Sequence, residues 1–346
     1  MKTDYIIHDT ALNGIKTLAD NSINCVITSP PYWQLRDYGF SEQWGLELTY
    51  QKYLEHLWSL MDEMWRVLKD DGSVWINLGD TYGTTSGNMR NTIKSKESDH
   101  TGESIHINQP KTIHKCQLLI PHRFAIGCID RGWIVRNDII WAKRNGMPES
   151  VTDRFSKKHE YIFLMVKSKK YYFDLDGIRD KNKQASIERS LRGNSETNKY
   201  VEGDHLPNGV HANTMSQPRP NRTKIAKENC EMYGSPRARN HRDTGYNEIL
   251  NELGKNPGDV SDFWDIPTQP SSKEHYATFN SKLIDKSIIA GCPENGIILD
   301  PFCGTGTTLI RSKQLMRNVI GIDGSKEYCE IADKELNKEL AQGRLF

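Results

Sequence analysis

The stretch "IILDPFCGTGTT", residues 297–308, decides how the C-terminal part of this 346-residue chain folds. A short apolar run ends in Asp300, a turn with Gly304 and Gly306 follows, and a helix is predicted to begin near Thr307. Glycines let a backbone approach a ligand closely, and the first N–H groups of a helix are free to bind one. The turn lacks both the third glycine of the G-x-G-x-x-G motif and the Gly-Lys-Ser/Thr of a phosphate loop. Alone, it fits a nucleotide, a nicotinamide cofactor or no ligand at all.

A second acidic residue, Asp323, ends the next predicted strand, "VIGID", seventeen residues after Gly306. A carboxylate at this place can accept hydrogen bonds from both hydroxyls of a ribose. The competing interpretation is an N-cap for the helix that begins within "GSKEY". The pairing with the glycine turn favours ribose binding.

The N-terminal part holds a second unusual strand end, in "CVITSPPYWQLRDYG", residues 25–39. Proline at position 30 biases Ser29 towards an extended backbone, and Pro31 removes a donor and fixes its own φ. The strand therefore ends in a rigid turn that presents oxygen acceptors and is followed by Tyr32.

Strands and helices alternate along the rest of the chain. Strands are predicted at 4–9, 23–29, 73–80, 133–143, 296–300 and 318–323, and helices at 10–22, 49–72 (closed by Gly72), 118–132, 275–292, 307–315 and from Lys326. This order predicts an α/β domain with a mostly parallel sheet. Residues 159–175 predict two further strands joined by a Lys-Ser-Lys-Lys turn, an antiparallel hairpin at the sheet edge.

Composition separates the chain into regions. The net charge is only +1, but residues 181–247 carry 12 Lys/Arg against 7 Asp/Glu. A basic region on a near-neutral protein is typical of nucleic-acid binding, although a solvated loop fits the charge equally well. Residues 84–115 are polar and aperiodic and are predicted to form a mobile loop. The seven cysteines include no C-x-x-C pair and the histidines show no ligand spacing, so no metal site is expected. The N-terminus resembles no signal peptide, and we expect a cytoplasmic protein without a membrane span.

Both strand ends fit one family. "DPFCGTGTT" resembles the S-adenosylmethionine turn of amino-methylating DNA methyltransferases, and "TSPPYW" resembles their catalytic motif; "NLGDTY" (77–82), "WAKRNGMPESVTDR" (141–154), "HEYIF" (159–163) and "HYATFN" (275–280) match as well. The catalytic motif precedes the cofactor turn, as in the circularly permuted β group. The resemblance implies a Rossmann-like fold with a catalytic half at 1–180, a target-recognition insert at 181–258 and a cofactor-binding half at 259–346.

The resemblance implies a catalytic set made of Ser29, Pro30, Pro31, Tyr32 and Asp80. Ser29 Oγ and the Pro30 carbonyl would hold the two hydrogens of a target amino group, and Tyr32 would stack on a base that is flipped out of the duplex. Trp33 is either a second wall or a packed indole. Asp80 either lines the same cleft or caps the following turn, and Asn77 is expected to point elsewhere or lie deeper.

The implied cofactor-binding set is Asp9, Thr28, His275, Phe279, Asn280, Asp300, Phe302, Gly304, Gly306, Thr307 and Asp323. Asp9 would reach the adenine amino group, with capping of the helix from Thr10 as the alternative. Phe302 would pack against the cofactor or fill the core. His275, Phe279 and Asn280 would lie near the methionine end.

In this family Ser at the first motif position accompanies methylation of cytosine N4. The sequence thus predicts an S-adenosylmethionine-dependent cytosine-N4 DNA methyltransferase acting on double-stranded DNA. It would be the modification enzyme of a restriction–modification system whose endonuclease, where one exists, is a separate chain. Adenine-N6 methylation is the alternative, and a non-catalytic nucleic-acid-binding protein is a third. Cytosine C5 methylation is disfavoured because it needs a thiolate, usually in a Pro-Cys pair, and the chain has no such pair.

Overall fold

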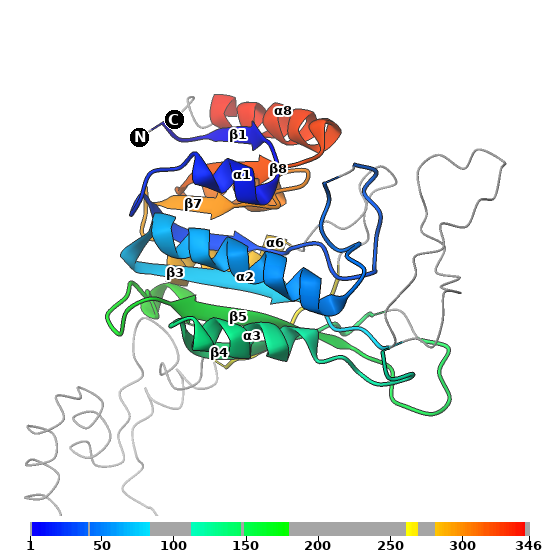
Figure 1. Ribbon diagram of the computed structural model, residues 1–346. Coiled ribbons are helices and arrows are strands. Elements are labelled where there is room, and N and C mark those ends of the chain that lie inside the picture. The colour runs from blue at the N-terminus through cyan, green and yellow to red at the C-terminus, as the bar shows by residue number, and fades with distance from the viewer. Residues whose placement is uncertain are drawn as a thin grey trace, which may run out of the picture. The chain divides into compact units, whose positions relative to one another are not determined.

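The computed structural model describes residues 2–40, 42–83, 112–146, 149–179, 261–268 and 281–342. By their contacts the residues divide into two units, Met1–Ile178 with Ser261–Phe346, and Arg179–Val260. The first unit holds the helices and strands described below (Figure 1). Apart from Arg179, the second unit lies outside the described residues, as does most of the predicted mobile loop (84–111). The predicted domain boundaries and the mobility of that loop therefore stay predictions.

The elements follow the alternation that the sequence predicts. In chain order they are β1 Tyr5–His8, α1 Ala11–Lys16, β2 Ile23–Thr28, α2 Tyr50–Val67, β3 Leu68–Leu78, α3 Ile120–Asp130, β4 Ile134–Ala142, β5 His159–Val166, a 3₁₀ turn at Asp176–Ile178, β6 Phe263–Asp265, α6 Ser281–Gly291, β7 Ile297–Asp300, α7 Thr307–Gln314, β8 Asn318–Asp323 and α8 Lys326–Gln342. Side-chain caps start the first two helices: Thr10 Oγ1 accepts from Asn13 N at 3.3 Å, and Thr49 Oγ1 accepts from Lys52 N at 3.0 Å.

The described strands form one eight-stranded sheet in the order β1-β8-β7-β2-β3-β5-β4-β6. Every neighbouring pair is parallel except β3–β5 and β5–β4, so β5 alone runs against the rest. The first strand pairs with the last, and β7 pairs with β2, which interleaves the two ends of the chain (Figure 1). The prediction of a mostly parallel, circularly permuted α/β sheet is confirmed.

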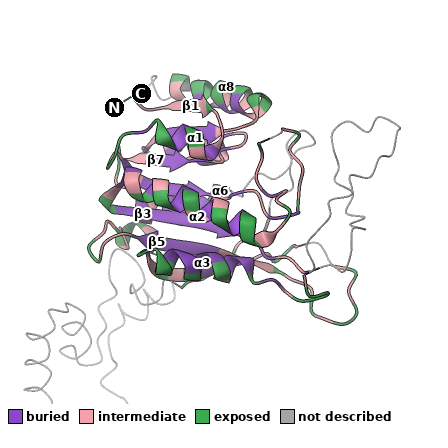
Figure 2. Cartoon of the chain, in the orientation of Figure 1, coloured by how far each residue is buried: buried purple, intermediate pink, exposed green. Residues whose placement is uncertain are grey.

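Helices cover both faces of the sheet. Val26 of β2 packs in the cluster that includes α1, α2 and α3, whereas its neighbours Cys25 and Ile27 pack in the cluster that includes α6. Successive residues of a strand point to opposite faces, so a strand that is buried on both sides must be apolar throughout. Figure 2 shows this burial along the central strands and the inner faces of the helices.

Three expectations about elements need correction. The predicted helix 49–72, α2 in the structure, ends at Val67 and not at Gly72. Leu68 has φ −70° and ψ 137°, which is extended backbone, and it begins β3. Gly72 is a strand residue whose Cβ would lie 2.8 Å from the Asn24 carbonyl oxygen. The antiparallel hairpin near the sheet edge exists, but β4 and β5 form it; residues 171–175 form no strand. The three-residue strand β6 was not predicted.

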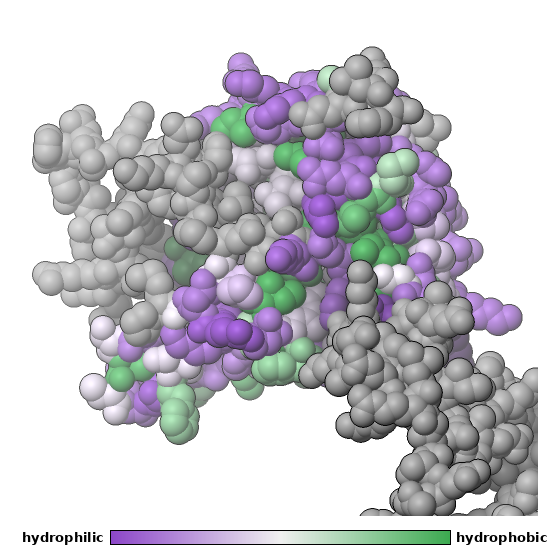
Figure 3. All heavy atoms as spheres, turned by 180° about the vertical axis from the view of Figure 1, so that it is seen from behind, coloured by the Kyte–Doolittle hydropathy of each residue, from purple (hydrophilic) through white to green (hydrophobic). Residues whose placement is uncertain are grey.

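The described part of the chain contains no helix that is both long and apolar enough to cross a membrane. Seen from behind, the described surface is mostly polar, with small apolar patches between polar side chains (Figure 3). The predicted cytoplasmic location stays a prediction.

Candidate active site

The two strand ends singled out in the sequence border one cavity of about 570 Å³. The turn after β2 and the turn after β7 both contribute to its wall, because these strands are parallel neighbours in the sheet. Nine of the predicted site residues line it: Ser29, Pro30, Pro31, Tyr32, Asp300, Phe302, Gly304, Thr307 and Asp323. Ser29 and Gly304 thus face the same cavity, as the family resemblance requires.

Asp300 is a buried carboxylate that joins the two turns. Thr28 Oγ1 donates to Asp300 Oδ1 at 2.7 Å, and Phe302 N donates to the same oxygen at 3.1 Å. Burial raises the pKa of Asp300 to about 6, and the hydrogen bonds from Thr28 and Thr308 offset only part of that rise. Thr28 itself is buried and does not line the cavity, so the structure does not place it where it could touch a ligand there, contrary to its prediction as a binding residue.

The two glycines of the turn have different roles. Gly304 has φ +52°, and a Cβ there would meet no atom within 4 Å, so the position opens directly into free space. Gly306 has φ +88° and precedes α7; its Cβ would lie 3.0 Å from that of Ala332, and it does not line the cavity. Gly304 leaves room for a ligand, and Gly306 permits the turn and the approach of α8.

Asp323 lines the cavity and also organises the backbone around it. Its Oδ2 accepts from Gly304 N at 2.9 Å, and its Oδ1 accepts from Ser325 N at 2.8 Å. Burial raises the pKa of Asp323, although these two N–H groups act in the opposite direction. Asp323 has the place in the cavity wall, but it is not the N-cap: α8 begins at Lys326, and Ser325 Oγ accepts from Tyr328 N at 3.4 Å as the capping group.

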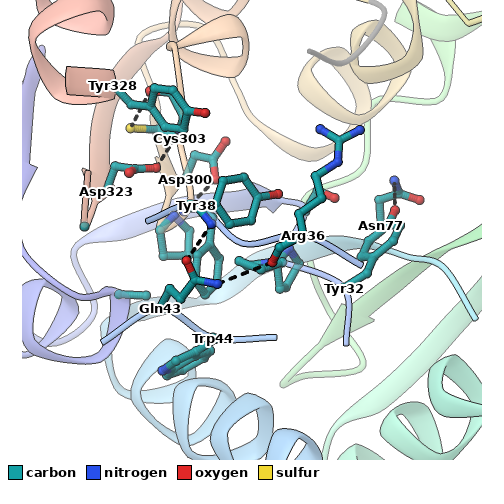
Figure 4. A pocket seen from close by; sticks show the side chains of 18 of the residues that line it. Tyr32, Arg36, Tyr38, Gln43, Trp44, Asn77, Asp300, Cys303, Asp323 and Tyr328 are labelled. Carbon is teal, nitrogen blue, oxygen red and sulfur yellow. Dashed lines mark hydrogen bonds between the residues drawn. The ribbon is translucent and has the colours of Figure 1, made fainter. Parts of the chain in front are cut away.

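Tyr32 is held at the other end of the cavity by a polar cluster. Its hydroxyl donates to Glu160 Oε2 at 2.7 Å. It also accepts from Asn77 Nδ2 at 2.8 Å (Figure 4). Gly79 flanks the ring so closely that a Cβ there would lie 2.6 Å from Tyr32 Cε2. Lys143 forms an ion pair with Glu160. Burial, followed by the Glu160 carboxylate, raises the pKa of Tyr32 well above its usual value, so the hydroxyl stays protonated.

Asn77 lines the cavity and is buried, which agrees with the alternative that it lies deeper and not with the one that it points elsewhere. Lys143 and Glu160 line the cavity as well and were not predicted as site residues. The sequence signal for Glu160 was a charged residue at the start of the apolar run "HEYIFLMV". Its partner Lys143 ends the neighbouring strand segment, and only the register of β4 against β5 brings the two together.

The segment at residues 33–48 forms a further wall, which the sequence did not indicate. Its Arg36, Tyr38, Phe40, Gln43 and Trp44 line the cavity. Trp44 packs against Phe302 with ring centroids 5.4 Å apart, so Phe302 contacts this wall as well as the cavity. Trp33 is a packed indole: it is buried, and its Nε1 donates to the Glu47 carbonyl at 2.9 Å.

Asp80 does not line the cavity, which corrects the prediction that it lies in the cleft. Its carboxylate accepts four hydrogen bonds of 2.8–3.0 Å, from Thr81 N, Gln117 Nε2, Leu119 N and Ile120 N. Its carbonyl accepts one more from Lys157. Asp80 therefore caps α3 and secures the segments on either side of it.

Asp9 also lies outside the cavity wall, and its carboxylate accepts from Thr10 N at 2.7 Å at the start of α1. The neighbouring Thr10 and Ala11 line the cavity instead. His275, Phe279 and Asn280 lie outside the described residues. Within the described ranges, no group of three or more His, Cys, Asp or Glu could hold a metal ion.

Replacing Asp80 by Ala tests its structural role. We expect the free energy of unfolding to fall by about 3 kcal/mol, because one buried and two partly buried backbone N–H groups lose their acceptor. Chemical denaturation measures the change. Asp70→Ala is the matched control, since that carboxylate is 91% exposed in its pair with Lys167 and should matter little. Equal stability of the two variants would contradict the assignment.

The comparisons with known proteins agree with this geometry. The DNA methylase family profile matches residues 23–334. Type II methyltransferase M.Cfr9I of Citrobacter freundii is 31% identical over 330 residues, 95% of this chain and 86% of that protein. Type II methyltransferase M.SmaI of Serratia marcescens is 30% identical, over 97% of this chain and 91% of that protein.

Two solved structures share the fold. The PvuII DNA methyltransferase (cytosine-N4-specific) matches with a TM-score of 0.52 and 16% identity, covering 99% of this chain and 94% of its own. TTHA0409, a putative DNA modification methylase from Thermus thermophilus in complex with S-adenosyl-L-methionine, matches with a TM-score of 0.52 and 20% identity, covering 97% and 96%. The cavity between the two strand ends, the family profile and the full-length relatives lead to one conclusion: this chain belongs to the DNA methylase family of N6/N4 methyltransferases.

Proposed function

We propose that this protein transfers a methyl group from S-adenosylmethionine to the exocyclic N4 amino group of a cytosine in double-stranded DNA. The observation that carries the proposal is that the Ser29–Tyr32 turn and the Gly304–Asp323 pair line one cavity. A methyl donor and an amino acceptor can meet only if both are bound in the same enclosed space.

The residues around the glycine turn fit S-adenosylmethionine, the methyl donor of this family. When bound, this cofactor supplies an electrophilic methyl group on a sulfonium. We assign Asp323 to the ribose hydroxyls; it lies within hydrogen-bond distance of Gly304 N, and Gly304 leaves free space for a ligand. We assign Asp300, a carboxylate on the cavity wall, to the cationic amino end of the cofactor.

The turn after β2 fits an amino group of a base. The lone pair of such a nitrogen is delocalised into the ring, so the nitrogen is a poor nucleophile. Acceptors that hold both N–H hydrogens favour a pyramidal nitrogen whose lone pair points at the methyl group. We assign this role to Ser29 Oγ and the Pro30 carbonyl, which the two prolines hold in a fixed geometry.

The target base must leave the duplex to reach these acceptors. We propose that it stacks on Tyr32, whose ring is fixed at its hydroxyl by Glu160 and Asn77 and along its edge by Gly79. A ring that is already immobilised loses little conformational entropy when a base stacks on it.

Cytosine is favoured over adenine because Ser occupies the first position of the motif. In permuted enzymes that methylate adenine N6, this position is Asp. The relatives from Citrobacter freundii and Serratia marcescens are Type II methyltransferases, which supports a role as the modification enzyme of a restriction–modification system. We assign target recognition to residues 181–258, and we expect any cognate endonuclease to be a separate chain.

Identification of the methylated nucleoside tests the proposal. The protein is incubated with mixed-sequence duplex DNA and labelled S-adenosylmethionine. The DNA is then digested to nucleosides, and the labelled nucleoside is identified by mass spectrometry. We expect label in N4-methylcytosine. Label in N6-methyladenine would replace the proposal by its alternative, and no label in any nucleoside would favour a non-catalytic DNA-binding protein.

Tyr32→Ala removes the proposed stacking platform. We expect turnover to fall by about 10- to 100-fold, since stacking of a base on an aromatic ring contributes roughly 1–3 kcal/mol. Cofactor affinity, measured by calorimetry, should change little. Tyr32→Phe is the matched control because it keeps the ring and loses only the hydroxyl. An unchanged rate in Tyr32→Ala would place the platform elsewhere.

The raised pKa of Asp300 predicts a pH-dependent cofactor affinity. The carboxylate is protonated below about pH 6, and a neutral carboxyl binds a cation less well, so affinity should fall as the pH drops through 6. Calorimetry with S-adenosylmethionine between pH 5 and 8 measures this, with uncharged adenosine as the control ligand. Asp300→Asn should bind weakly with no such pH step. The same step in Asp300→Asn would show that another group titrates.

A further inference from the structure

Arg36 brings an unpaired cation into the cavity. It lines the wall, its Nη1 is shielded from solvent, and this nitrogen has no hydrogen-bond partner. Among the described residues, no carboxylate lies within ion-pairing distance of its guanidinium, whereas Arg66, Arg144, Arg154 and Arg311 each pair with one. Arg36 as a whole is only partly buried, but a shielded N–H group of a cation that lacks an acceptor still costs free energy, so this arrangement indicates an anionic ligand.

The backbone holds Arg36 in place. Gln43 spans the turn that carries it: Nε2 donates to the Arg36 carbonyl at 3.3 Å, and Oε1 accepts from Tyr38 N at 2.6 Å (Figure 4). Gly39 completes the turn with φ +82°. Gln43 therefore fixes the backbone from which the Arg36 side chain extends into the cavity.

Arg36 lies between Tyr38 and Tyr32 in the cavity (Figure 4). Tyr38 extends from there towards α8, where its ring packs edge-on against Tyr328 with ring centroids 6.5 Å apart. Burial raises the pKa of Tyr38, and the nearest charges acting on that hydroxyl are Arg36, which lowers the pKa, and Asp323, which raises it. One tyrosine hydroxyl is thus within electrostatic reach of both Arg36 and the Asp323 carboxylate.

We propose that Arg36 binds the carboxylate of the methionine part of S-adenosylmethionine. The inference rests on the cofactor named in the proposed function. The amino-acid end of that molecule carries one cation and one anion, and the cavity presents one buried carboxylate, Asp300, and one unpaired guanidinium, Arg36. A guanidinium offers two parallel N–H donors that match the two oxygens of a carboxylate.

A DNA phosphate is the other anion that this protein meets, but the burial of Nη1 favours the cofactor. Phosphates of a duplex stay at the protein surface, where the cations that contact them are hydrated. Arg36 Nη1 is shielded from solvent, and Arg36 lines the same cavity as the glycine turn. The carboxylate of a small molecule can enter this space, whereas the backbone of a duplex stays outside it.

Calorimetry with two cofactor forms tests the proposal without DNA. Decarboxylated S-adenosylmethionine keeps the adenosine, the sulfonium and the ammonium, and lacks only the carboxylate. We expect Arg36→Met to weaken binding of S-adenosylmethionine by about tenfold or more, as for a lost charge-assisted hydrogen bond, and to leave binding of the decarboxylated form within about twofold. Arg36→Gln, which keeps one amide donor, should show the same selectivity with a smaller loss. Arg144→Met is the matched control, because that exposed arginine pairs with Asp265.

Two results would overturn the proposal. Equal losses for both cofactor forms in Arg36→Met and Arg36→Gln would assign Arg36 a general structural role. Unchanged affinity for S-adenosylmethionine with weaker DNA binding would assign it to a phosphate. The proposed function fails separately: a wild-type chain that binds the cofactor with the expected selectivity but methylates no cytosine would leave the role of Arg36 intact.

Discussion

The hydrogen bond from Thr28 to Asp300 is the contact on which the site depends. It is 2.7 Å long, buried, and joins residues 272 positions apart in the sequence. It exists because β2 and β7 are parallel neighbours, so their carboxyl ends meet at one edge of the sheet. Sites of open α/β sheets form at this edge, where loops leave adjacent strands. In the permuted chain the Ser-Pro-Pro-Tyr turn comes near the N-terminus and the glycine turn near the C-terminus. The pairing of β2 with β7 still brings the two turns side by side in space.

The environments of Asp300 and Asp323, the two carboxylates near the glycine turn, favour a ligand that is cationic or carries hydroxyl groups. Burial raises the pKa values of Asp300 and Asp323, which means that their ionised forms lack full solvation. Backbone N–H groups of Phe302, Gly304 and Ser325 compensate only in part. A ligand that donates hydrogen bonds or positive charge completes this solvation. The energy stored in the ligand-free site thus contributes to binding.

Local patterns were enough to predict the two strand ends, because apolar runs, prolines and glycines act within a few residues. They did not place Asp80, since a carboxylate after a strand can either face a cavity or cap a helix, and the choice depends on the path of residues 117–120. They also missed the end of α2 at Val67. Residues 68–72 continue the helical pattern in sequence, and pairing with β2 draws Leu68 into the sheet instead. Tertiary contacts decided both cases.

The wall at residues 33–48 physically links the two halves of the site. It begins directly after Tyr32, and it then meets the cofactor side at three places: Trp44 against Phe302, Tyr38 against Tyr328, and Phe40 so close to Gly324 that a Cβ there would lie 2.6 Å from its ring. Side chains that are packed this tightly cannot move independently. A ligand that fixes this wall beside the glycine turn therefore also restrains the backbone that follows Tyr32, the proposed base platform. In a reaction that transfers a group between two ligands, one shared wall positions both ligands relative to each other.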